Sequence, residues 1–228
     1  MRPALILLLF AIPTGPLWAQ VPANARPVVR ATGNASVFTQ PDQVQIDATV
    51  ATQGMTAQAA SSQNATQAAA VLSALNQLLG TGANIKTISY SISPNYTYPP
   101  NGTPTLTGYT ASNTIEVTLS ALNSAGSVID TAVQAGATSI AGLRFSLKDS
   151  EPSRRQALQQ ATSVAKSHAD SMATALGGTV STIVLLQEGS SVQSVAIAVP
   201  AGVAATTTPV QSGLIEVDAT VTIEALLN

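Results

Sequence analysis

The sequence predicts an α+β protein whose elements follow the order ββαββαβαββ, with helices packed on one face of a mixed or antiparallel sheet. Stretches in which apolar and polar residues alternate predict half-buried strands, because successive side chains of a strand point to opposite faces. Other stretches repeat apolar residues at helical spacing and predict amphipathic helices. Since single helices separate the strands, we expect split β-α-β units.

Two strands and a long helix open the domain. Val28–Phe38 and Val44–Thr52 alternate apolar with polar residues, and Gln40-Pro41-Asp42 supplies a turn between them. The spacing then becomes helical, with Thr56 as the N-cap and Gly80 as the terminating residue. This helix must pack on the sheet through an apolar stripe, and its opposite side is uncharged. The stripe consists of Ala68, Val71, Leu72, Leu75, Leu78 and Leu79.

A long hairpin follows, with strands at Ile85–Ile92 and Tyr109–Leu119 and a loop at Pro94–Leu106. An uncharged segment, residues 189–213, separates the last two strands and can add a hairpin through Val195–Val199. The remaining elements are a short helix from Asn123 or Ser124 to Ala135, a strand Ile140–Leu147, a helix Pro152–Leu176 and the strands Val180–Gln187 and Ile215–Leu226.

The first 19 residues predict a secretory signal peptide that is cleaved after Ala19, because Arg2, the apolar run Ala4–Ile12 and a small residue at the cut follow in order. Residues 20–27 form a flexible leader. Residues 28–228 form one domain, either compact or with two lobes, in which 189–213 is a variable segment. No later segment reaches the roughly 20 apolar residues that span a bilayer. We expect a periplasmic protein, with outer-membrane association as the alternative.

The composition excludes several classes of function. The chain has no cysteine, so disulfides, thiol nucleophiles and thiolate metal sites are absent from it. The net charge of −2 and the lack of a basic cluster beyond Arg154-Arg155 argue against a nucleic-acid partner. Charged residues make up only 9% of the chain, against roughly 25% in ordinary soluble domains. Three long spans carry no charge: 48–85, 87–115 and 189–214.

No catalytic, metal or cofactor constellation is predicted. His168 is the only histidine and falls on the apolar stripe of its helix, so we expect a partly buried packing residue rather than a base. Lys166 and Asp170 flank it but point elsewhere. The carboxylates show no paired-acid or calcium-loop spacing. They are Asp42, Asp47, Glu116, Asp130, Asp149, Glu151, Asp170, Glu188, Glu216, Asp218 and Glu224.

The tyrosines give the sharper prediction. All four of them, Tyr90, Tyr96, Tyr98 and Tyr109, lie on the predicted hairpin. Tyrosine is enriched among interface anchors, because it buries a large apolar body while its hydroxyl stays hydrated. We therefore expect these residues to form a homo-oligomer interface. The alternative is that they line the rim of the domain's own sheet.

The hairpin also carries a resemblance to a known family. The segments Ile88–Tyr98 (ISYSISPNYTY), Gly108–Leu119 (GYTASNTIEVTL) and Gly136–Leu147 (GATSIAGLRFSL) are similar to the SIMPL-domain family of bacterial periplasmic proteins. The similarity extends upstream to Pro41-Asp42 and downstream through Arg154–Gly178. The family includes periplasmic immunogenic and oxidative-stress-defence proteins, and some relatives build large ring-like or channel-like homo-oligomers.

At one place the chain departs from the family pattern, because Gly33-Asn34-Ala35 stands where Gly-x-Gly is expected. This departure bears on the turn expected there and not on the family.

The resemblance implies a non-enzymatic periplasmic protein that self-assembles as an envelope scaffold or binding module and contributes to oxidative-stress tolerance. A surface or outer-membrane-associated adhesin that uses segment 189–213 is one alternative. The other is a hydrolase with an unrecognised site built on His168 or on serine and lysine.

Overall fold

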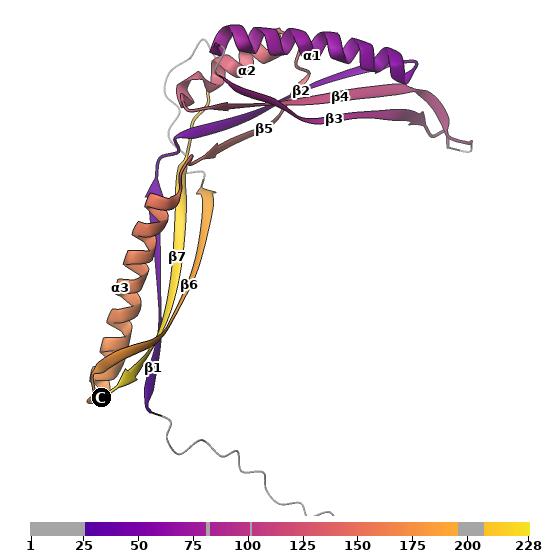
Figure 1. Ribbon diagram of the computed structural model, residues 1–228. Helices are drawn as coiled ribbons and strands as arrows, with labels where there is room; N and C mark the ends of the chain where they lie inside the picture. The colour runs from indigo at the N-terminus through magenta and orange to yellow at the C-terminus, as the bar shows by residue number, and fades with distance from the viewer. Residues whose placement is uncertain (1–25, 81–82, 101, 196–207) are drawn as a thin grey trace, which may run out of the picture.

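The computed structural model describes residues 26–80, 83–100, 102–195 and 208–228. It confirms the predicted α+β class and element order, and its strands form two antiparallel sheets. Helices cover one face of each sheet, and the two halves meet at a steep angle (Figure 1). The signal peptide, most of the leader and the hairpin predicted through Val195–Val199 lie outside the described residues.

The first half is a four-stranded sheet with the order β3-β4-β2-β5. Because β2 and β3 both run antiparallel to β4 between them, β2-α1-β3 is a split β-α-β unit. β4-α2-β5 is a second such unit around β2, and together they give a ferredoxin-like topology. The elements are β2 Gln43–Gly54, α1 Ala57–Leu79, β3 Asn84–Thr97, β4 Thr105–Leu119, η1 Leu122–Ser124, α2 Ala125–Gln134 and β5 Ser139–Ser146.

The second half is a three-stranded sheet with the order β1-β7-β6, and α3 lies along it (Figure 1). Its elements are β1 Val28–Thr39, α3 Glu151–Ala175, β6 Val180–Val195 and β7 Leu214–Leu227. Each half has its own apolar core, one between α1, α2 and the four-stranded sheet and one between α3 and the three-stranded sheet.

The helix α1 follows the predicted pattern closely. The side chain of Thr56 accepts a hydrogen bond from the backbone N–H of Ala59, which satisfies one of the free donors at the helix start. Gly80 ends the helix with a positive φ of 81°. The inner positions Val71 and Leu75 are fully buried against β2 and β4, whereas Leu78, an expected member of the stripe, is 44% exposed.

The segment Gln40-Pro41-Asp42 links the two sheets and is not a turn between paired strands. Among the described strands, β1 pairs with β7, and β2 pairs with β4 and β5. Asp42 holds this link in place: its carboxylate accepts the Lys148 N–H at 2.7 Å, and its own N–H donates to Ser146 O at 3.2 Å. The chain thus passes directly from one half to the other.

Gly33 lies in the middle of β1, which is continuous as predicted over Val28–Phe38, so the chain forms no turn at Gly33-Asn34-Ala35. A Cβ at Gly33 would lie 2.1 Å from Ala161 O and 2.3 Å from Ala165 N. The helix α3 can approach β1 this closely because its buried positions are all alanine. These positions are Ala157, Ala161, Ala165, Ala169 and Ala173.

The loop is shorter than the predicted Pro94–Leu106, because β3 continues to Thr97 and β4 begins at Thr105. Pro94 is compatible with this arrangement, since β3 is the outer strand of its sheet and proline is tolerated at sheet edges.

The close approach of α3 and β1 makes Gly33 sensitive to substitution. We expect Gly33→Ala to lower the free energy of unfolding by about 1–3 kcal/mol, because the added methyl group has to displace backbone atoms. Urea denaturation followed by circular dichroism measures the change. Gly189→Ala in β6 is the matched control, since nothing lies within 4 Å of the place that its methyl group would occupy. Equal stability of the two variants would contradict the packing account.

Candidate functional site

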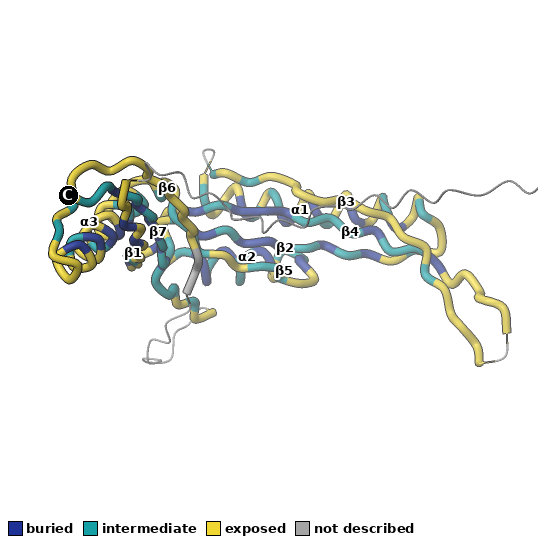
Figure 2. Tube along the Cα trace, turned by 90° about the horizontal axis from the view of Figure 1, so that it is seen from below, coloured by how far each residue is buried: buried dark blue, intermediate teal, exposed yellow. Residues whose placement is uncertain are grey.

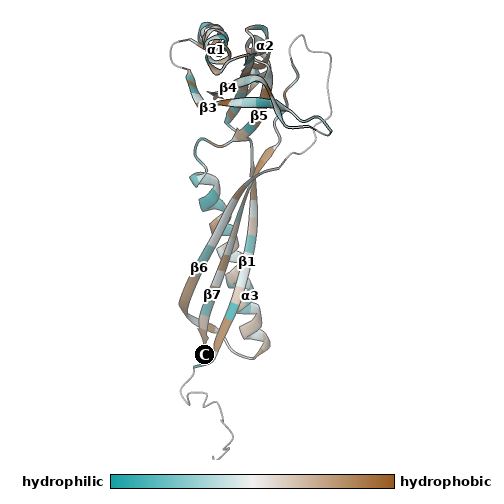
Figure 3. Cartoon of the chain, turned by 90° about the vertical axis from the view of Figure 1, so that its right-hand side faces the viewer, coloured by the Kyte–Doolittle hydropathy of each residue, from teal (hydrophilic) through white to brown (hydrophobic). Residues whose placement is uncertain are grey.

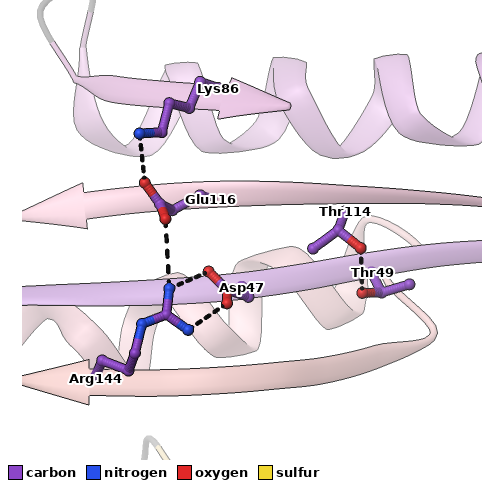
Figure 4. A network of polar contacts seen from close by, with 6 residues as sticks. All are labelled: Asp47, Thr49, Lys86, Thr114, Glu116 and Arg144. Carbon is purple, nitrogen blue, oxygen red and sulfur yellow. Dashed lines mark hydrogen bonds and ion pairs between the residues drawn. The ribbon is translucent and has the colours of Figure 1, made fainter. Parts of the chain in front are cut away.

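A row of four charged side chains crosses the helix-free face of the four-stranded sheet, with one residue from each strand (Figure 4). Arg144 of β5 donates to both carboxylate oxygens of Asp47 on β2, at 2.7 and 3.2 Å. The same guanidinium reaches Glu116 Oε2 on β4 at 3.4 Å. Lys86 Nζ of β3 lies 2.9 Å from Glu116 Oε1, although this oxygen has no well-aligned hydrogen bond. The row thus spans the whole width of the sheet.

The two carboxylates at the centre of the row are nearly buried. Asp47 and Glu116 are directly opposite each other in the β2–β4 register, and both side chains are 9% exposed. Like charges in such a cross-strand pair destabilise a sheet unless cations compensate them. Arg144 compensates both, and Lys86 compensates Glu116 from the other side.

Backbone geometry makes room for Arg144. The β2–β5 register shifts at Asp47/Ala48, so Ala141 is an extra residue in β5. A Cβ at the next residue, Gly142, would lie 2.9 Å from both Arg144 Nη1 and Asp47 Oδ2. The glycine therefore leaves the space in which the guanidinium lies over the sheet.

The electrostatics of the row favour a structural role. The Asp47 carboxylate raises the pKa of Arg144, first through the hydrogen bond and then through its charge. A cation whose pKa is raised on folding contributes stability at all pH values below its ordinary pKa, and this contribution is lost only as the pH rises through the raised value. At neutral pH the row holds two cations and two anions, which compensate one another. Within the described residues, no group of three or more metal-ligating side chains is found.

The predicted interface tyrosines lie along one hairpin, and three of them are exposed. Tyr90 shares a hydrogen bond of 2.9 Å with Ser61 of α1 while half of it remains exposed. Tyr96 and Tyr98 lie at the far end of the hairpin, where Tyr98 is 72% exposed, and Tyr109 is half-buried on β4. Their role at an interface remains a prediction.

The strand β3 is exposed along nearly its whole length, as the yellow tube in Figure 2 shows. It is the outer strand of its sheet, and α1 packs mainly over β2 and β4. Ile88 and Ile92 are exposed together with the tyrosines, and Leu106 is exposed on the facing strand β4. No charge interrupts β3 after Lys86. A long apolar edge strand of this kind is a template for pairing with another strand.

His168 is exposed, so the expectation of a partly buried packing histidine is wrong. The buried stripe of α3 runs through Ala165 and Ala169 instead and leaves His168 at the margin of the helix. Its Nδ1 lies 3.0 Å from the carbonyl oxygen of Thr32 in β1, and Lys166 pairs with Asp170 rather than with the imidazole. Because β1 is an outer strand, the imidazole covers part of its free edge.

The sequence does not single out Asp47, Glu116 and Arg144 as a set. Asp47 lies out of phase with the apolar positions of β2, which places its side chain on the open face. The alternation in β2 thus indicates from the sequence that Asp47 lies on the open face. The strand order that brings the three residues together cannot be inferred from one sequence.

Among the described residues, no helix has the length and apolar character needed to cross a membrane. A family model named SIMPL and described as "Protein of unknown function (DUF541)" matches residues 29–225. The 26 kDa periplasmic immunogenic protein of Brucella melitensis biotype 1 is similar to this chain, with 28% identity over 162 residues. The match covers 67% of this chain and 64% of that protein, which is slightly less than two thirds of the relative's length.

We expect Arg144→Met to lower the free energy of unfolding by about 1–3 kcal/mol, because it leaves two nearly buried carboxylates side by side without their common cation. Thermal or urea unfolding at pH 7 measures the effect. The exposed Arg155→Met is the control. Adding Asp47→Asn to Arg144→Met should restore part of the loss, since it removes the carboxylate that Lys86 does not compensate. If the losses of unfolding free energy caused by Arg144→Met and Asp47→Asn were strictly additive, the interaction between the two side chains would be contradicted.

Proposed function

The chain belongs to the SIMPL family, and we propose that it is an exported, non-enzymatic envelope protein that assembles into homo-oligomers through the outer edge of its four-stranded sheet. The predicted signal peptide and the periplasmic name of its Brucella relative support a periplasmic location. In this role the protein is a scaffold or binding module, and we extend the proposal to tolerance of oxidative stress. Since the chain has no cysteine, such a contribution does not use thiol chemistry.

The observation that carries the proposal is the unprotected edge of β3. Soluble proteins usually shield outer strands with charges, bulges or covering helices. The strand β3 has register shifts at Thr87/Ser89 and Asn95/Tyr96 and contains Pro94, but it carries no charge from Thr87 to Thr97 and exposes Ile88, Tyr90, Ile92 and Tyr96. The outer strand β5 is short, and the edge of β1 is partly covered by His168. The outer strand β6 is also long and exposed, but it has two register shifts and carries Glu188, which pairs with Arg154.

The chemistry of this edge fits a second copy of the chain. An added strand satisfies the outward N–H and C=O groups of β3 through backbone hydrogen bonds, whatever its side chains. Aromatic anchors then supply most of the side-chain binding energy in a typical interface. The hairpin of β3 and β4 projects beyond the N-terminal end of α1 (Figure 1). Tyr96 and Tyr98 flank the end of β3 at Thr97 and are both exposed, so they are accessible to a neighbouring molecule.

The charged row supports a scaffold rather than a reaction centre. Both of its carboxylates form ion pairs within the sheet, Asp47 with Arg144 and Glu116 with Arg144 and Lys86. The imidazole of His168 contacts a backbone carbonyl and not a nucleophile. Both arrangements favour a protein whose polar groups stabilise the fold.

We expect Tyr96→Asp combined with Tyr98→Asp to shift the particle towards monomer, because two carboxylates would then have to be desolvated in an apolar contact. Sedimentation velocity at micromolar concentration measures the particle mass, and circular dichroism checks that the fold survives. The matched control combines Leu78→Asp with Val133→Asp, since these exposed apolar residues lie on the helix layer away from β3. A wild-type monomer, or equal dissociation of both double variants, would refute assembly through this edge.

A further inference from the structure

An apolar groove lies at the free end of the three-stranded half, between the end of α3 and the start of β1. Its volume is about 440 Å³. The lining combines aliphatic side chains with one arginine. These residues are Val28, Arg30, Met172, Ala175, Leu176 and Leu227, with the buried Val29 behind them. Hydrophobic ribbon gathers at this end of β1 and β6 (Figure 3). The groove belongs to neither the charged row nor the β3 edge.

The aliphatic residues of the groove are unusually open. Leu176, which follows the end of α3, is 76% exposed, and Met172 in its last turn is 39% exposed. Exposed apolar side chains gathered in a concave surface mark a binding site more often than single exposed residues do. A groove of this volume suits a small ligand rather than a folded partner.

Arg30 is the charged residue in the lining of the groove. Within the described residues, its guanidinium forms no ion pair, and Glu224, its neighbour across the β1–β7 register, does not reach it. The backbone adds a second donor. Pro27 O accepts the Leu227 N–H, so the backbone N–H and C=O groups of odd-numbered residues of β1 point towards β7. Those of even-numbered residues point away from β7, as Thr32 O does towards His168. Arg30 has the parity of Thr32, and its N–H therefore points out of the sheet edge.

We propose that this groove binds a free fatty acid, with its carboxylate at Arg30 and its alkyl chain along Met172, Ala175 and Leu176. A carboxylate accepts hydrogen bonds from a guanidinium and from a backbone N–H together, and Arg30 carries both donors. An alkyl chain removes the exposed methionine and leucine side chains from water. The proposal is independent of assembly through β3, because the two surfaces lie on different halves of the protein.

The experiment titrates the full exported protein with sodium dodecanoate below its micelle concentration and measures binding by isothermal titration calorimetry. We expect one dodecanoate per chain. Dodecanol, which keeps the chain without the charge, and butyrate, which keeps the charge with little chain, should each bind at least about tenfold more weakly, a difference of about 1.4 kcal/mol. A diazirine-bearing fatty acid should label peptides that contain residues 28–30 or 172–176.

Variants in the charged and in the apolar lining of the groove separate the two contributions. Arg30→Gln and Leu176→Ser should each weaken dodecanoate binding roughly tenfold, whereas the distant controls Arg155→Gln and Leu78→Ser should not change it. Circular dichroism confirms the fold of each variant. Absence of binding up to millimolar dodecanoate, equal affinity in all variants, or labelling confined to other peptides would overturn the proposal. Binding to anionic vesicles without binding of monomeric dodecanoate would assign the surface to a membrane and would overturn it equally.

Discussion

Each of the two sheets is covered by helices on one face only, so the opposite face and the outer strands have to be stable in water or find another partner. A sheet edge exposes unpaired N–H and C=O groups, and an uncovered sheet face exposes every second side chain. Different kinds of residue occupy each exposed face and edge. These differences explain where polar residues gather and where apolar residues remain exposed.

The open face of the four-stranded sheet carries polar and charged side chains. Thr49 and Thr114 share a hydrogen bond across β2 and β4, and the charged row lies further along the same two strands (Figure 4). Arg144 joins β5 to β2 and β4, and Lys86 joins β3 to β4, so the ion pairs connect all four strands. At the edge of β1, the imidazole of His168 contacts the carbonyl oxygen of Thr32. Beyond Lys86, the described residues of β3 carry no charge and are not covered by a helix, and this is the edge through which we propose that a second chain pairs.

The elements are well predicted from the sequence because their signals are local. Thr56 and Gly80 delimit α1 through capping geometry, and the alternation in β1 and β2 fixes their buried faces. Strand pairing between distant parts of the chain is harder to predict from the sequence. Nothing local distinguishes a turn at Gln40-Pro41-Asp42 from a link between two sheets, because the difference depends on β7, at the far end of the chain, pairing with β1.

The errors within elements have similar physical causes. The spacing puts His168 on an apolar stripe because the helix contains few large apolar residues, and its true contact surface consists of alanines that a search for bulky residues passes over. Gly33 marks the close contact that selects those alanines. The charged row depends on a strand order and on a register shift at Ala141, and neither can be inferred from spacing alone.

The most direct test of assembly through the β3 edge is hydrogen–deuterium exchange of the wild-type protein at two concentrations, one that favours the assembled particle and one that favours the monomer. Backbone pairing with a second chain protects the outward amides of an edge strand, whereas a bare edge exchanges freely. The account predicts that peptides covering Asn84–Thr97 become protected as concentration rises, while peptides from the outer side of α1 do not change. Rapid exchange of Asn84–Thr97 at both concentrations, in a particle shown by its mass to be assembled, would contradict it.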